Sequence, residues 1–143
     1  MPDGFPRAKE LRAESLSPAP AEWGDELQIR KIDGMPKVQE HALFHAPSRT
    51  LIVGDLLFNF GADASGWTRF IARYVMRLPS LTGMSAAFRF MIQDREAFQR
   101  SVLKILEWDF DRVIVGHGEK IETEGKRKLR IVLRRFGLSD AAN

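Results

Sequence analysis

Two residues capable of metal or acid–base chemistry each follow an apolar, β-branched run that ends in glycine. Asp55 comes directly after Leu51–Gly54, and His117 comes directly after Val113–Gly116. Such runs are typical of buried strands, and open sheets usually carry their chemistry just beyond the strand ends. We therefore expect the chain to turn sharply at each glycine, and Asp55 and His117 to meet at one edge of one sheet.

These two side chains suit a divalent cation such as zinc. A carboxylate can bridge two ions through its two oxygens, and the neutral imidazole of histidine is the commonest metal ligand. Each residue also has a structural alternative, because Asp55 could cap backbone N–H groups and His117 could bond a loop carbonyl. Glu119 either orients His117 as a neighbour of a metal ligand or is a surface charge.

Three further ligand candidates precede Asp55, namely Glu40, His41 and His45. On one strand the two histidines would share a face about 13 Å apart, too far to hold one ion together. We expect one of the three to touch the site; the alternative for either histidine is the wet face of an edge strand. A zinc-protease helix is excluded because Ala42 occupies the position of the glutamate in His-Glu-x-x-His.

Strands and turns can be predicted around these candidates. Alternating polarity predicts a strand at 26–32, and two runs joined at Pro47–Ser48 predict a hairpin over 38–54. A further buried strand is predicted at 110–115. Residues 1–25 contain four prolines and few apolar anchors, so we expect an irregular segment with at most a short helix at 7–14.

Helical spacing of apolar residues recurs in three later segments. The segment 67–78 places Trp67, Phe70, Ile71, Tyr74 and Val75 on one stripe. The second helix, capped by Asp94 and running to about Trp108, has its buried face at Phe98, Val102, Ile105 and Leu106. The third is expected to begin at a Thr123 cap and end near Gly137. Strands followed by helices, a strand and a helix predict one layered α/β (α+β) domain over residues 1–143.

Composition narrows the class of protein. The chain has 143 residues, 44% of them hydrophobic and 29% charged, as in an ordinary globular domain, and it lacks cysteine. It shows no signal-peptide core and no apolar run of roughly 20 residues, so we expect a cytoplasmic protein with no membrane partner. Without a glycine-rich phosphate loop, no nucleotide cofactor is expected. A net charge of +3, concentrated near the end, allows a nucleic-acid-binding face or a solvated helix.

Two segments resemble the metallo-β-lactamase superfamily, and most closely an uncharacterised bacterial branch of it. They are "EHALFHAPSRTLIVGDLLFNF" (40–60) and "WDFDRVIVGHGE" (108–119). The resemblance implies a four-layer αββα sandwich with a metal site along one edge of its two sheets. It also implies that Asp55 matches the bridging aspartate and His117 the late histidine ligand. The family's His-x-His-x-Asp-His signature is absent, and no histidine lies near twenty residues before Asp55.

The resemblance therefore covers the middle and C-terminal part of that fold, from residue 26 onward. The resemblance implies a mixed sheet with helices packed on one face. In a half-fold of this kind, the other face of the sheet would be exposed unless another polypeptide segment packs on it. We expect either self-association or a truncated family member that lacks its N-terminal half. Three functions stay open: a non-catalytic metallo-β-lactamase-like protein, a metal-dependent hydrolase with a partial or inter-chain zinc site, and a nucleic-acid-binding module.

Overall fold

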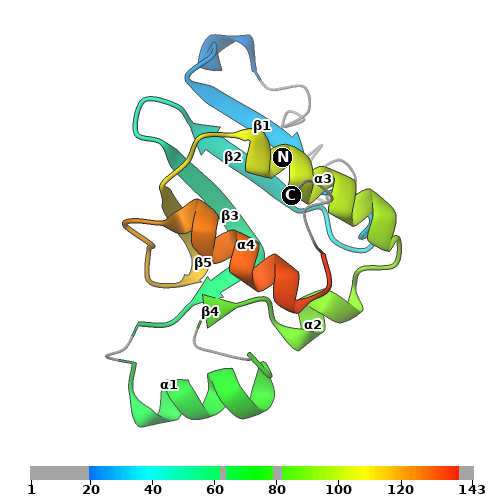
Figure 1. Ribbon diagram of the computed structural model, residues 1–143, viewed down its shortest axis with the longest axis vertical. Coiled ribbons are helices and arrows are strands. Elements are labelled where there is room, and N and C mark those ends of the chain that lie inside the picture. The colour runs from blue at the N-terminus through cyan, green and yellow to red at the C-terminus, as the bar shows by residue number, and fades with distance from the viewer. Residues whose placement is uncertain (1–19, 62–63, 79–81, 139–143) are drawn as a thin grey trace, which may run out of the picture.

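The computed structural model describes residues 20–61, 64–78 and 82–138, so the helix predicted at 7–14 lies outside the described residues. The described chain is a mixed five-stranded sheet with helices, which confirms the α+β class (Figure 1). The strands are β1 (Leu27–Lys31), β2 (His41–His45), β3 (Thr50–Asn59), β4 (Thr82–Gly83) and β5 (Arg112–Gly118). The helices are η1 (Ala21–Trp23), α1 (Gly66–Phe70), η2 (Ile71–Val75), α2 (Ala86–Phe90), α3 (Arg95–Glu107) and α4 (Gly125–Arg135).

Strand β3 is the centre of the sheet. It pairs antiparallel with β2, with Phe44 opposite Leu51, so the predicted hairpin is confirmed. Strand β1 continues this meander on the far side of β2, in the place predicted for the first strand. Strand β5 runs parallel to β3, and the short β4 pairs with the last residues of β3. Every other strand is therefore joined to the sheet through β3 or β2.

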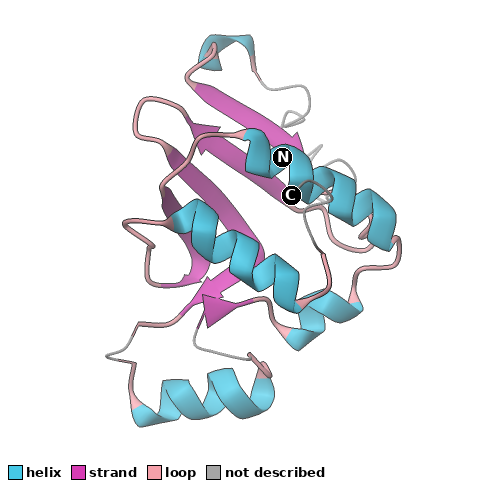
Figure 2. Cartoon of the chain, viewed as in Figure 1, coloured by secondary structure: helices cyan, strands magenta, loops and turns pink. Residues whose placement is uncertain are grey.

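Helices α3 and α4 cover one face of the sheet (Figure 2). The four residues predicted for the buried face of α3 all lie in the core, and the Asp94 carboxylate accepts a hydrogen bond from the Ala97 N–H at 2.9 Å. Helix α4 adds Leu129, Val132 and Leu133 to the same core. This one core fixes the two strands that carry Asp55 and His117, β3 and β5.

The opposite face of the sheet carries an apolar row that crosses four strands. Ile29 lies opposite Leu43, Leu43 opposite Ile52, and Ile52 opposite Ile114. Because side chains alternate along a strand, these residues point away from the helix-covered side to which Phe44 contributes. Ile114 is exposed and the other three are partly exposed. The expectation that this face is covered by self-association stays a prediction.

The predictions of sharp turns at Gly54 and Gly116 are both wrong, since β5 also runs past its glycine to Gly118. Strand β3 continues to Asn59, and Asp55 lies within it rather than beyond its end. The pairing with β5 instead shifts register, because Val53 lies opposite Val115 while Phe58 lies opposite His117. Between these two pairs β3 contributes more residues than β5, and the extra residues form a bulge. After the bulge, the pairing of β3 with β5 resumes and its pairing with β4 begins. Gly54 thus marks a bulge inside a strand.

The start of α4 also differs from the prediction. Glu124, not Thr123, is the N-cap residue, with a left-handed φ of 59° and no side-chain capping bond. The Asp111 carboxylate instead accepts a hydrogen bond from the backbone N–H of Glu124 at 2.7 Å, at the start of the helix. The predicted end is confirmed, since Gly137 has a φ of 66°, a conformation that glycine adopts without strain.

The predicted helix over 67–78 is present as α1 followed directly by the π-helical turn η2. Its apolar stripe does not face the core, although such stripes usually do. Trp67, Phe70, Tyr74 and Val75 are exposed, whereas Ala72 is buried against Phe58 and Leu78. No helix within the described ranges has both the length and the apolar character needed to cross a bilayer.

Candidate functional site

A buried glutamate, Glu40, forms a hydrogen bond with the backbone at the bulge in β3. The Glu40 carboxylate accepts the Gly54 N–H at 2.7 Å. Glu40 is only 9% exposed, and its burial raises the pKa of the carboxyl above the ordinary value of 4.5. The nearby Asp55 charge adds to this rise of the pKa, while the backbone N–H groups of Gly54, Asp55 and Leu56 oppose it. Glu40 therefore holds the strand at the point where its ladder is interrupted.

Two glycines make room for this arrangement. A Cβ atom at Gly54 would lie 3.0 Å from the Glu40 Oε2. A Cβ atom at Gly116 would lie 3.0 Å from the carbonyl oxygen of Gly54. The glycines that close the two apolar runs are thus explained by the close approach of β3, β5 and the Glu40 carboxylate.

Asp55 and His117 meet above the bulge. The Asp55 Oδ1 lies 3.3 Å from the His117 Nε2, and the two side chains are 51% and 62% exposed. The imidazole also stacks on Phe58, with ring centroids 5.3 Å apart and planes 5° from parallel. The stack leaves the Nε2 edge for Asp55 and restricts the orientation of the ring. The pair can share one cation, or the carboxylate can orient the imidazole as an acid or base.

The pair opens onto a pocket of about 610 Å³. Its walls come from the turn before β2, from η2 and from α2, and they are mainly apolar: Val38, Phe60, Val75, Met76, Phe88 and Met91. A small number of polar groups in a largely apolar concavity is the usual composition of a small-molecule site. The Asp55–His117 pair is therefore placed where a ligand of modest size can reach it.

The remaining candidates lie elsewhere. The His41 Nδ1 is 3.3 Å from the Gln39 carbonyl oxygen, and the His45 Nδ1 is 2.7 Å from the Ser48 hydroxyl. The Glu119 carboxylate lies against Gly61, and His117 contacts the Asp55 carboxylate. In the part of the chain that the structure describes, no group of three histidines and acids is arranged to hold a metal ion.

A scan of protein-family models finds no match to this chain, and a search of curated proteins finds none either. The metallo-β-lactamase resemblance therefore stays a prediction. Its two ligand positions, Asp55 and His117, are the two that the structure brings together.

The roles of two contributors to the site differ from the sequence-based expectation or lie outside it. Glu40 is a metal-ligand candidate in the sequence, whereas its carboxylate accepts the Gly54 N–H of the bulge. Phe58 stacks on the imidazole of His117, a role that the sequence does not indicate. A usable signal for Glu40 existed, because a glycine inside a buried strand indicates a bulge or a close neighbour. No comparable local signal marks Phe58.

Proposed function

We propose that this chain is a metallo-β-lactamase-like protein that binds a divalent cation, such as zinc, weakly and is not catalytic by itself. The observation that carries the proposal is the 3.3 Å approach of the Asp55 carboxylate to the His117 imidazole. Carboxylate and imidazole are both ordinary zinc ligands, and a cation between them would replace the contact that they make with each other. The substrate of any related reaction is not specified by these residues.

The number of ligands argues against catalysis by a single chain. A catalytic zinc normally takes three protein ligands and a water, and a two-metal centre needs more. Asp55 and His117 supply two, and the described residues offer no third histidine or acid grouped with them. Two ligands support weak binding and leave the metal mostly coordinated by water.

Calorimetric titration with zinc tests the proposal. Native protein is expected to bind one zinc weakly, and Asp55→Ala and His117→Ala are each expected to abolish that binding. His41→Ala is the matched control, because its imidazole contacts the Gln39 carbonyl instead of Asp55. Zinc at about 100 times its Kd would also stabilise the native fold by about 2.7 kcal/mol, a shift that the two site variants should lose.

Two results would overturn this reading. Zinc binding that survives both site substitutions would place the metal elsewhere. Zinc-dependent hydrolysis by dilute, monomeric native protein, across ester, lactone and phosphodiester substrates, would show that one chain holds a complete catalytic centre.

A second candidate is a metal-dependent hydrolase whose zinc site is completed by another polypeptide. The exposure of Asp55 and His117 favours it, because half-exposed side chains leave space for further ligands. In this case specific activity with zinc should rise with protein concentration, in step with self-association seen by sedimentation velocity. Specific activity that stays at zero across the concentration range in which self-association occurs would reject it.

A further inference from the structure

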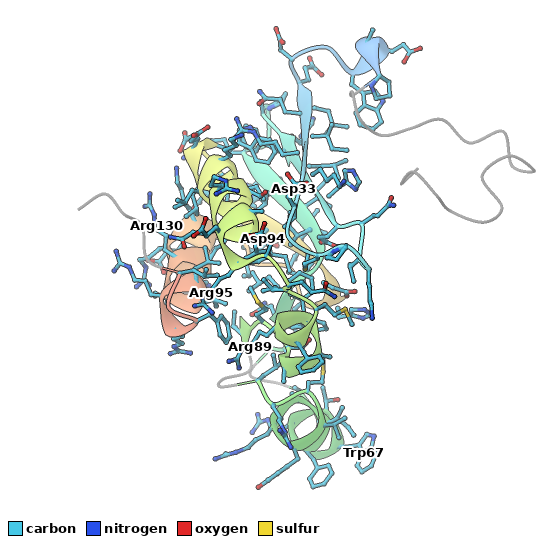
Figure 3. The ribbon with its side chains drawn as sticks, turned by 90° about the vertical axis from the view of Figure 1, so that its right-hand side faces the viewer. Asp33, Trp67, Arg89, Asp94, Arg95 and Arg130 are labelled. Carbon is cyan, nitrogen blue, oxygen red and sulfur yellow. The ribbon has the colours of Figure 1, made fainter. Side chains whose placement is uncertain are left out.

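The helix formed by α1 and η2 exposes an aromatic surface that nothing else in the described chain covers. Trp67 is 71% exposed, Phe70 48% and Tyr74 64%. Figure 3 shows Trp67 at the far end of the molecule, pointing away from the sheet. Large aromatic side chains gathered on one exposed face usually mark a surface that contacts a partner.

The aromatic rings form one continuous surface. The Trp67 and Phe70 rings are stacked with centroids 5.7 Å apart, and the Phe70 and Tyr74 centroids are 4.9 Å apart. On the other side of the helix Ala72 is buried against Phe58 and Leu78. This buried contact fixes the rotation of the helix, so the aromatic surface is held outward by packing.

The charge of the same segment has one sign. Arg69, Arg73 and Arg77 are all exposed, and the sequence from 64 to 78 contains no acidic residue. Helical spacing places Arg69 and Arg73 on a different side of the helix from Trp67 and Phe70. An aromatic face flanked by arginines is the composition of helices that lie in the interface of an anionic membrane.

We propose that the α1–η2 helix docks this protein on an anionic lipid surface, with Trp67, Phe70 and Tyr74 in the headgroup region. A second copy of the chain is a poorer occupant, because facing helices would bring the arginines of both copies together. Single-stranded nucleic acid is also poorer, because the Trp67 and Phe70 rings, which would stack on bases, already stack on each other. The proposal is an alternative to the sequence-based expectation of no membrane partner, and it does not depend on metal binding.

Docking would also orient the pocket. Val75 belongs to the exposed side of η2, and with Met76 it lines the cavity that holds Asp55 and His117. A helix lying in the interface would therefore bring one wall of that cavity to the bilayer surface.

Flotation of the full chain with lipid vesicles tests the proposal. Vesicles of equal parts phosphatidylcholine and phosphatidylglycerol are expected to carry the protein, and pure phosphatidylcholine vesicles to carry much less. Trp67→Ser and Phe70→Ser should each weaken binding on the order of tenfold, as expected for an interfacial aromatic anchor. Arg73→Glu should weaken binding to the anionic vesicles and reduce its sensitivity to salt.

Ile114→Ser is the matched control. Ile114 is 45% exposed, a fraction similar to the 48% of Phe70, but it belongs to strand β5 of the sheet and not to the α1–η2 helix. This variant should bind vesicles as the native protein does. Since all of these side chains are exposed, unchanged melting temperatures verify that each variant is folded. Fluorescence provides a second readout, because vesicles should shift the emission of native protein to the blue and should not shift that of Trp67→Phe.

Three results would overturn the proposal. Vesicle binding unaffected by both aromatic substitutions would place the membrane contact elsewhere. Concentration-dependent dimerisation that Trp67→Ser abolishes, without vesicle binding, would identify a second copy as the occupant. Binding of single-stranded RNA that Phe70→Ser abolishes, again without vesicle binding, would identify a nucleic-acid surface.

Discussion

Glu40 and Asp55 contact the same bulge of β3, one from the buried side and one from the pocket side. Glu40 is buried and accepts the backbone N–H of Gly54, whereas Asp55 is half-exposed and contacts the imidazole edge of His117. A buried carboxylate with backbone partners determines the shape of the strand. An exposed carboxylate beside an exposed imidazole can exchange that neighbour for a ligand. The comparison separates the residue that maintains the fold here from those available for chemistry.

The largest expected effect comes from removing the buried carboxylate. Glu40→Ala should lower the free energy of unfolding by about 3 kcal/mol, because the Gly54 N–H of the bulge loses its acceptor and the buried side chain leaves a cavity. Urea denaturation followed by far-UV circular dichroism measures this. A loss no larger than that for Asp55→Ala would show that the two carboxylates do not differ as described.

The close approach of the two strands predicts the next effect. Gly116→Ala places a methyl group 3.0 Å from the Gly54 carbonyl oxygen, a backbone atom that cannot rotate away. We expect a loss of about 1–2 kcal/mol, from strand displacement at the bulge. Gly66→Ala is the matched control, since a Cβ atom there meets nothing within 4 Å. Equal stability of the two variants would contradict tight packing at Gly116.

The raised pKa of Glu40 predicts a smaller, pH-dependent effect. The folded protein holds this proton more tightly than the unfolded chain, so the stabilising contribution is complete below pH 4.5 and is lost as pH rises through the raised pKa. The free energy of unfolding of the native protein should therefore fall relative to that of Glu40→Gln as pH rises above about 4.5. Thermal melts of both proteins at matched pH values measure it. A native protein that gains stability relative to Glu40→Gln over that window would mean that hydrogen bonding to the backbone outweighs burial.

The smallest expected effect belongs to the exposed pair. Asp55→Asn and His117→Gln should each change the free energy of unfolding by less than about 0.5 kcal/mol, because half-exposed ion pairs contribute little. The same urea experiment measures both variants. A loss as large as that for Glu40→Ala would assign the pair a structural role instead of a ligand-binding one.

Structural features that depend on one local physical cause could be predicted from the sequence. The hairpin at Pro47–Ser48 and the buried face of α3 follow from turn chemistry and apolar spacing, and both are confirmed. The convergence of Asp55 and His117 could also be anticipated, because each follows a strand-like run. The hairpin and the buried face depend on residues close together in the chain, and the convergence was inferred from two such local runs.

Features that depend on contacts between residues far apart in the sequence could not be predicted. Whether the chain turns at Gly54 or bulges depends on pairing with β5 and on the Glu40 carboxylate, neither of which local periodicity specifies. Likewise, the stripe on α1–η2 has core-like spacing, and only the position of Ala72 shows that it faces outward. Periodicity identifies an apolar face without identifying what covers it.

The parallel pairing of β3 with β5 joins segments that are far apart in the chain, as the contact between Arg49 and Asp109 across 60 residues shows. The β1–β2–β3 meander, by contrast, closes through short connections. Because closing a long loop costs more entropy than closing a short one, we expect β5 to join the sheet late in folding. His117 would then reach Asp55 only in the final assembly step, so a partly folded chain would expose the carboxylate without its imidazole.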